Sequence, residues 1–369
     1  MSKRIHHLSP LALLALTACG GGGGGGSSSG SSSSGGSGSS GSSSYSILGK
    51  VIKGPLTNAL VFLDYNDNGT FDAGETSVRT ASDGSYTLSS SQALVSIVAL
   101  TDDTTIDNSS GSVLAGVTLR APSGASVVSP NTTLMKEAGL TAAEVGEVLG
   151  LSADIDITTF NPYATGVDAA KALAVEKVSQ QIMTTISTFA AVTEGSGASA
   201  ADSFSTALAS VVEVVQQKAV AFKSDPSVKL DLSSTDDLAS IKNSVTTKAA
   251  SVSGVDQTAL ATISNDTATA IKNVNAKIDT VTDLTSDDSK NVFSTTQVLS
   301  EQVETAAKTE AAGGSGSIEF VNTARIDSAA ANAAPTDISL SASTISENAG
   351  SLIIGSFSTT DDQKSGGFT

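Results

Sequence analysis

The spacing of apolar residues changes once along this chain, and that change most constrains its fold. From Tyr45 to about residue 120, short β-rich runs are separated by turn residues such as Gly54 and Gly84. This pattern predicts a small β-sandwich over residues 45–120. Over residues 121–312, apolar positions recur three and four apart, which predicts an up-and-down bundle of five or six amphipathic helices. The expected fold class is therefore multidomain α+β.

Two short sequence signals predict where the first helices begin. Ser129 followed by Pro130 is typical of a helix start, because proline fits the first turn and serine can cap it. Thr141 and Glu144 have the spacing of a capping box.

Segments of biased composition flank these two domains. Residues 19–44 are almost entirely Gly and Ser, which cannot bury apolar surface and should behave as a flexible tether. Residues 313–334 are rich in Gly, Ser, Ala and Asn and are predicted to be a linker. Residues 335–369 have a β-like pattern that is too short for a sandwich core of its own. We expect that the sequence is the N-terminal portion of a longer protein, or that its end is a broken module.

The N-terminal residues 1–18 have the features of a bacterial export signal. Lys3 and Arg4 supply positive charge ahead of an apolar stretch that is too short to span a bilayer. The run Leu16-Thr17-Ala18-Cys19 resembles the lipobox of bacterial lipoproteins. This resemblance implies that residues 1–18 are removed and that Cys19 carries lipid, which would anchor the chain at the outer membrane or cell surface. The alternative is an ordinary secretory signal with an incidental cysteine.

Composition excludes several classes of active site. The two histidines are His6 and His7, and the single cysteine is Cys19. The chain beyond Cys19 therefore cannot form a Ser-His-Asp triad, a Cys-His pair or a zinc or haem site held by histidine. The sequence has no phosphate-binding loop, and its one Gly-x-Ser-x-Gly match, residues 26–30, lies in the Gly/Ser tether and not in a strand-to-helix turn. With 37 acidic and 20 basic residues, a net charge of -17 argues against nucleic acid as a partner. We expect a protein that is not an enzyme.

The most specific motif is the twelve-residue stretch Asp64–Glu75. Oxygen-bearing side chains stand at positions 1, 3, 5, 9 and 12, and glycine stands at position 6, which is the spacing of a calcium loop. The expected ligands are Asp64, Asn66, Asn68, Thr70 through its backbone carbonyl, Asp72 and Glu75. Calcium is favoured over magnesium because it takes six to eight oxygens in this geometry. The alternative is a polar hairpin whose side chains satisfy only the turn backbone.

Strand-like runs, and not helices, flank this loop. The stretch Gly49–Leu88 joins an apolar strand, an Asp/Asn-rich loop ending in Gly-Glu and an Asp-Gly-x-aromatic-x-Leu strand. It resembles the carboxypeptidase-regulatory-like and serine-aspartate-repeat B-type modules of bacterial surface proteins. The resemblance implies a prealbumin-like sandwich stiffened by calcium. Asn68 stands where that family usually has Asp, which implies weaker binding.

The C-terminal segment carries a second resemblance. The runs Pro335-Thr336-Asp337-Ile338, Glu347-Asn348-Ala349-Gly350 and Thr359-Thr360-Asp361 resemble the opening of a cadherin-like repeat. By this resemblance Glu347 and Asp361 are candidate calcium ligands between successive repeats. The alternative is that both are solvated edge charges.

Together these features predict a lipid-anchored, calcium-binding surface protein that displays adhesion modules. Its expected partners are the membrane, through Cys19, and a surface protein, a glycan or a second copy, through the cadherin-like segment. Two alternatives stay open. One is a stalk or accessory region of a larger secreted enzyme, and the other is a periplasmic lipoprotein that binds a ligand in a cleft of the helical bundle.

Overall fold

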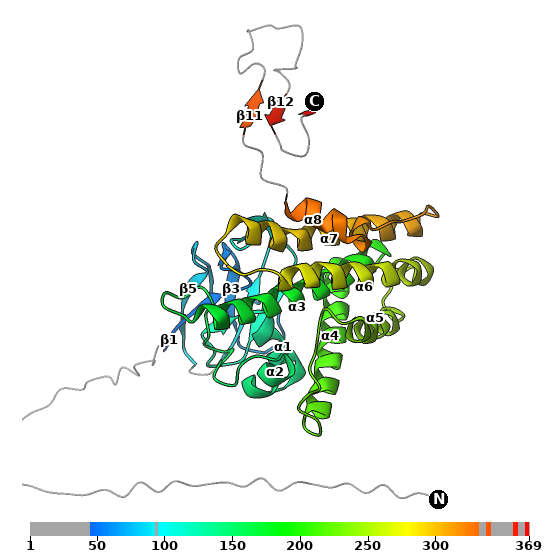
Figure 1. The fold of residues 1–369 in the computed structure, drawn as a ribbon. Coiled ribbons are helices and arrows are strands. Elements are labelled where there is room, and N and C mark those ends of the chain that lie inside the picture. The colour runs from blue at the N-terminus through cyan, green and yellow to red at the C-terminus, as the bar shows by residue number, and fades with distance from the viewer. Residues whose placement is uncertain (1–44, 93–94, 332–336, 341–356, 361–365, 369) are drawn as a thin grey trace, which may run out of the picture. The chain divides into compact units, whose positions relative to one another are not determined.

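A β region (residues 45–128) is followed along the chain by a helical region (residues 130–331), as Figure 1 shows. The computed structural model describes residues 45–92, 95–331, 337–340, 357–360 and 366–368. The predicted mixed α+β class, with a small-sheet region before a helical region, is confirmed. Cys19, Glu347 and Asp361 lie outside the described residues.

The described part of the β region forms three small sheets. Its strands are β1 (Tyr45–Val51), β2 (Leu56–Thr57), β3 (Leu60–Asp64), β4 (Ser77–Arg79), β5 (Ser85–Ser90), β6 (Ser96–Leu100), β7 (Ile106–Asp107), β8 (Ser112–Val113), β9 (Thr118–Ala121) and β10 (Val127–Val128). The strand orders are β10-β1-β5, β4-β3-β6-β9 and β2-β7-β8. Every pair is antiparallel except β1 and β10, which run parallel.

Buried and exposed residues alternate along strands such as β5, and the buried apolar ones help to form the core of the β region. On β5, Tyr86 and Leu88 are buried while the residue between them is exposed. They join Leu63 of β3 in one apolar cluster. Met183 of helix α3 (Ala169–Gly195) belongs to the same cluster, so the helical region helps to close the core of the β region.

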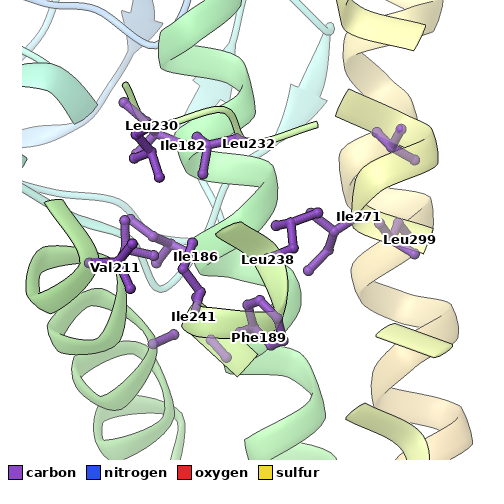
Figure 2. Close-up of a cluster of buried hydrophobic side chains, with 14 of the residues drawn as sticks. Ile182, Ile186, Phe189, Val211, Leu230, Leu232, Leu238, Ile241, Ile271 and Leu299 are labelled. Atoms are coloured by element: carbon purple, nitrogen blue, oxygen red, sulfur yellow. The ribbon is translucent and has the colours of Figure 1, made fainter. Parts of the chain in front are cut away.

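The described helical region contains eight α-helices and one 3-10 helix. They are α1 (Pro130–Ala138), α2 (Ala142–Val148), α3, α4 (Ala200–Phe222), α5 (Thr235–Ala249), α6 (Gln257–Asp279), α7 (Asp287–Ala311), η1 (Glu319–Val321) and α8 (Thr323–Ala330). Helix α3 contacts α4, α6 and α7. In Figure 2, Ile182, Ile186 and Phe189 of α3 lie in one apolar cluster with side chains from α4, α5 and α6. None of the described helices combines the length and apolar character needed to cross a membrane.

The predicted helix starts are confirmed. The Ser129 side chain accepts a hydrogen bond from the backbone N–H of Thr132, and Pro130 is the first residue of α1. Thr141 and Glu144 form the predicted capping box of α2.

The number of helices was predicted too low. Five or six were expected between residues 121 and 312, whereas α1 to α7 lie there. Helices α1 and α2, whose starts the caps did predict, have only nine and seven residues and so add no repeating apolar stripe to the count.

The prediction of a linker over residues 313–334 is wrong for its middle part. This segment contains η1 and α8, and Phe320 and Ile326 are buried in the core of the helical region. The linker was predicted from the abundance of Ala, Asn and Ser, and this composition gave no indication of the short amphipathic helix.

Small polar side chains contribute to the core of the helical region. The hydroxyls of Thr184, Thr185 and Thr193 are buried, and each donates to the carbonyl four residues earlier at 2.8–2.9 Å. These bonds satisfy a buried hydroxyl within its own helix. Two of these hydroxyls also meet a neighbouring helix: Thr184 lies 2.7 Å from the hydroxyl of Thr296 on α7, and Asn275 of α6 donates to Thr185 at 3.3 Å.

A separate small sheet follows near the C-terminus. Its strands are β11 (Asp337–Leu340), β12 (Phe357–Thr360) and β13 (Gly366–Phe368), paired antiparallel in the order β11-β12-β13. β structure is thus present within the segment 335–369, where the sequence predicted it.

Candidate metal site

The predicted calcium loop, Asp64–Glu75, connects β3 to β4. Pairing of these strands places Phe62 opposite Ser77. The Leu63 N–H also donates to the carbonyl of Thr76 at 3.0 Å. The two ends of the loop are therefore held together by the hairpin at its base.

Asp64 anchors the interior of the loop. Its side chain is fully buried, and its carboxylate accepts hydrogen bonds from the backbone N–H groups of Asn68 at 3.1 Å and Gly69 at 2.7 Å. Asp67 and Gly69 have φ angles of 60° and 75°, which turn the chain back over this carboxylate. Glycine adopts this conformation without steric cost, as the sixth position of the loop requires.

Asn66, Asn68 and Asp72 face one another. The Nδ2 atom of each amide lies 2.8 Å from Oδ2 of Asp72. Hydrogen bonds from Asn66 and Asn68 hold the pKa of the Asp72 carboxyl below its usual range. A half-turn of either amide exchanges its nitrogen and oxygen, so all three side chains can present oxygens to the same point.

Glu75 closes the loop onto its beginning. Its Oε1 accepts from the Tyr65 N–H at 3.0 Å and its Oε2 from the Asp72 N–H at 2.9 Å. Thr70 lies on the exposed side, where its N–H donates to Oδ1 of Asn68 at 2.7 Å. Among the predicted ligands, Asn66, Asn68 and Asp72 thus contact one another, while Asp64 and Glu75 bond to backbone N–H groups of the same loop.

An aromatic contact holds the loop against strand β3. The ring centroids of Phe62 and Phe71 lie 5.3 Å apart with a tilt of 56°. Phe62 is fully buried, and Phe71 is 42% exposed. The apolar residue at position eight of the loop therefore rests on strand β3.

Two basic side chains from outside the loop contact it, and neither contact was predicted from the sequence. Arg120 of β9 places Nη2 at 3.2 Å from Oδ2 of Asp64 and Nη1 at 2.8 Å from Oε1 of Glu137. Lys136 of α1 places Nζ at 2.7 Å from Oδ2 of Asp67. These contacts join residues 56 and 69 positions apart to the loop. No local pattern could have indicated them.

The donor set of the loop suits a hard cation. Three carboxylates, two amides and the Thr70 carbonyl can together supply the six or more oxygens that calcium takes. Within the described part of the chain, no three Asp, Glu, His or Cys side chains already form a metal-binding cluster. Asp64 and Glu75 do not contribute to such a cluster because their carboxylates accept hydrogen bonds from backbone N–H groups. Binding a cation would require these carboxylates to exchange N–H donors for the ion, and Asp64 to give up Arg120.

A cleft of about 960 Å³ lies beside the loop, between the β region and α4. Asn68, Gly69 and Thr70 form part of its wall. Phe204 and Leu208 line the apolar side contributed by α4.

No known family model, curated protein or solved structure matches the chain. The candidate site is therefore defined by its own residues: Asp64, Asn66, Asn68, Thr70, Asp72 and Glu75.

Proposed function

We propose that this chain is a lipid-anchored, calcium-binding surface protein that displays cadherin-like modules and catalyses no reaction. The observation that carries the proposal is the loop Asp64–Glu75, in which five oxygen-bearing side chains gather within one hairpin connection. The lipobox-like run ending at Cys19 supports membrane anchoring. The motif around Glu347 supports the adhesion role.

Calcium would act here as a structural ion. It would replace the hydrogen bonds that now link Asp64, Asp72 and Glu75 to N–H groups and would fix the connection between β3 and β4. This would stiffen the prealbumin-like sandwich that we propose for the β region. Two of the ligands are neutral amides, so we expect affinity in the weak range of extracellular modules, roughly 0.1–1 mM.

Calorimetric titration of the full chain with calcium tests the ion-binding part. Asp64→Asn and Glu75→Gln keep the size of each side chain while removing its charge, so both should abolish or strongly weaken binding of one ion. Asp83→Asn is the matched control, because Asp83 is an exposed carboxylate in the neighbouring turn of the β region. Equal heats in all four proteins, or no heat in the wild type, would overturn the proposal.

Membrane fractionation tests the anchoring part. Wild-type chain expressed in a bacterium with its lipoprotein pathway intact should incorporate labelled fatty acid and sediment with membranes. Cys19→Ser should lose the label and become soluble after export. A wild-type protein without label would contradict lipid anchoring and leave calcium binding untouched.

A ligand-binding lipoprotein is a second candidate, which the cleft beside α4 favours. Its size is ample for a small molecule, and Leu208 and Val212 give it an apolar wall. Native mass spectrometry of the exported protein would detect such a ligand. Leu208→Trp, which fills the cleft, should then reduce its occupancy.

A further inference from the structure

A second polar cluster is buried where the β region meets α3. None of its residues is a proposed calcium ligand. Its members are Lys53 in the turn after β1, Asp107 on β7, Tyr163 in the segment before α3, and Glu176 and Gln180 on α3. The Lys53 Nζ and Asp107 Oδ2 atoms lie 2.7 Å apart. The two residues are only 3% and 1% exposed.

Hydrogen bonds connect this ion pair to α3. Oδ1 of Asp107 accepts from the N–H of Ser109 at 2.9 Å and from its hydroxyl at 2.6 Å. Nε2 of Gln180 donates to Oγ of Ser109 at 2.9 Å and to Oε1 of Glu176 at 2.7 Å. The network therefore runs from β7 across the junction to a fully buried glutamate.

The backbone packs closely over this network. Gly54 has a φ of 69°, and a Cβ there would lie 2.3 Å from Oγ of Ser109 and 2.4 Å from Oδ1 of Asp107. A side chain at this position would therefore require the backbone to move, although a cavity of about 360 Å³ is lined in part by Lys53 and Asp107.

Three polar atoms of the cluster lack a partner among the described residues. They are Oε2 of Glu176, Oη of Tyr163 and Oε1 of Gln180. A buried carboxylate oxygen without a donor is costly, whereas a protonated carboxyl carries no charge and gains a donor of its own. The unused oxygens of Tyr163 and Gln180 belong to the same cluster and can accept from it.

We propose that Glu176 is a proton-operated latch between the β region and the helical region. With a proton on its carboxyl group the junction is closed. Loss of that proton as the pH rises loosens the contact between β7 and α3.

Four groups face Glu176; Asp107 adds to the effect of burial in favouring the protonated form, whereas the other three favour the ionised form. The four groups are Asp107 from β7, Lys53 from the turn after β1, Tyr163 from the segment before α3 and Gln180 from α3 itself. Burial raises the pKa of Glu176 to about 7, and the hydrogen bond from Gln180 opposes this rise only in part. If Glu176 ionises, the cluster holds two carboxylates for one ammonium group.

The sign of the pH dependence follows from this shift. The pKa of glutamate is 4.5 in the unfolded chain and higher in the folded one. The stabilisation is therefore complete below pH 4.5 and is lost as pH rises toward and through 7. Between pH 6 and 8.5 the unfolding equilibrium constant should rise about tenfold. No histidine lies in residues 45–331 to add its own titration in this window.

Denaturant unfolding of the full chain at pH 6, 7 and 8.5 tests the latch. The wild type should show the tenfold rise, and Glu176→Gln should be nearly independent of pH, because glutamine fills the same space without ionising. Glu194→Gln is the matched control: it lies on the same helix, and burial followed by Glu304 raises the pKa of that carboxyl too, but it is outside the cluster. It should keep most of the wild-type rise. A flat wild-type profile, or loss of the rise in Glu194→Gln instead of Glu176→Gln, would overturn the proposal.

Hydrogen exchange of the wild type locates the effect without any variant. After correction for the intrinsic rate, residues 104–116 and 160–180 should exchange faster at pH 8.5 than at pH 6, by more than the remainder of the chain. A uniform change, or none, would show that Glu176 does not control this junction.

Discussion

The β region and the junction with α3 hold polar side chains in opposite ways. In the loop Asp64–Glu75, most side-chain bonds join partners at most ten positions apart, and the contacts from Arg120 and Lys136 are the exceptions. In the junction cluster, bonds join Lys53 to Asp107 and Ser109 to Gln180, 54 and 71 positions apart, and the atoms are shielded from water. We propose that the loop exchanges hydrogen bonds for an ion. In the junction cluster, Glu176 is fully buried, and the change that we propose there is the loss of a proton.

Breaking the buried ion pair should have the largest effect. Lys53→Met leaves Asp107 as a buried carboxylate without its cation, which should lower the free energy of unfolding by about 3–5 kcal/mol. Lys50→Met is the matched control three positions earlier, since the Lys50–Asp83 pair is largely exposed and should contribute less than about 1 kcal/mol. Urea unfolding of both variants measures the difference. Equal losses of unfolding free energy would show that the buried and the more exposed ion pair contribute equally to stability.

Removing the guanidinium beside the loop should alter calcium binding. Arg120 pairs with Asp64, a proposed ligand, and must leave when the ion arrives. Arg120→Met should therefore bind calcium roughly fivefold more tightly, a gain of about 1 kcal/mol, while being less stable without calcium. Arg79→Met, which breaks an exposed pair with Asp102 elsewhere in the β region, should leave calorimetric affinity unchanged. Weaker binding in Arg120→Met would show that the arginine supports the site.

The aromatic contact of the loop should have a modest effect. Phe71 is 42% exposed, so Phe71→Ala should cost about 0.5–1.5 kcal/mol, mainly from its contact with Phe62. Thermal unfolding with and without calcium measures it. A larger loss in the presence of calcium would show that this ring also positions the ligands.

The smallest effect should come from the cap of α2. The backbone N–H of Thr141, with smaller contributions from Lys223 and the Thr141 hydroxyl, lowers the pKa of Glu144 to about 2. The stabilisation is therefore present above pH 4.5 and is lost as pH falls toward 2. Hydrogen exchange of α2 should accelerate over that interval, and Glu144→Gln should remove this dependence. Glu147→Gln, an exposed change on the same helix, should leave it in place.

The sequence predicted features that are set by neighbouring residues. The spacing within Asp64–Glu75 indicated a polar loop because twelve consecutive residues contain the whole pattern; Asn66, Asn68 and Asp72 meet there, and calcium binding stays a prediction. The caps at Ser129 and Thr141 were predicted for the same reason. The long helices were visible through their apolar period.

Features that depend on packing could not be predicted. Arg120 and Lys136 reach the loop only because β9 and α1 lie beside it. The burial of Glu176 depends on the packing of α3 against the β region, which no local sequence pattern indicates. Residues 313–334 were assigned to a linker because an eight-residue helix is too short to show a period.

Hydrogen exchange of the full chain with and without calcium determines whether the loop Asp64–Glu75 takes the ion. At roughly 10 mM calcium, above the range of weak extracellular sites, amides of residues 64–79 should become strongly protected while those of residues 160–180 change little. This result would show that the exposed loop is the cluster that takes the ion. Unchanged exchange in residues 64–79 would contradict the account and reduce the loop to a polar hairpin.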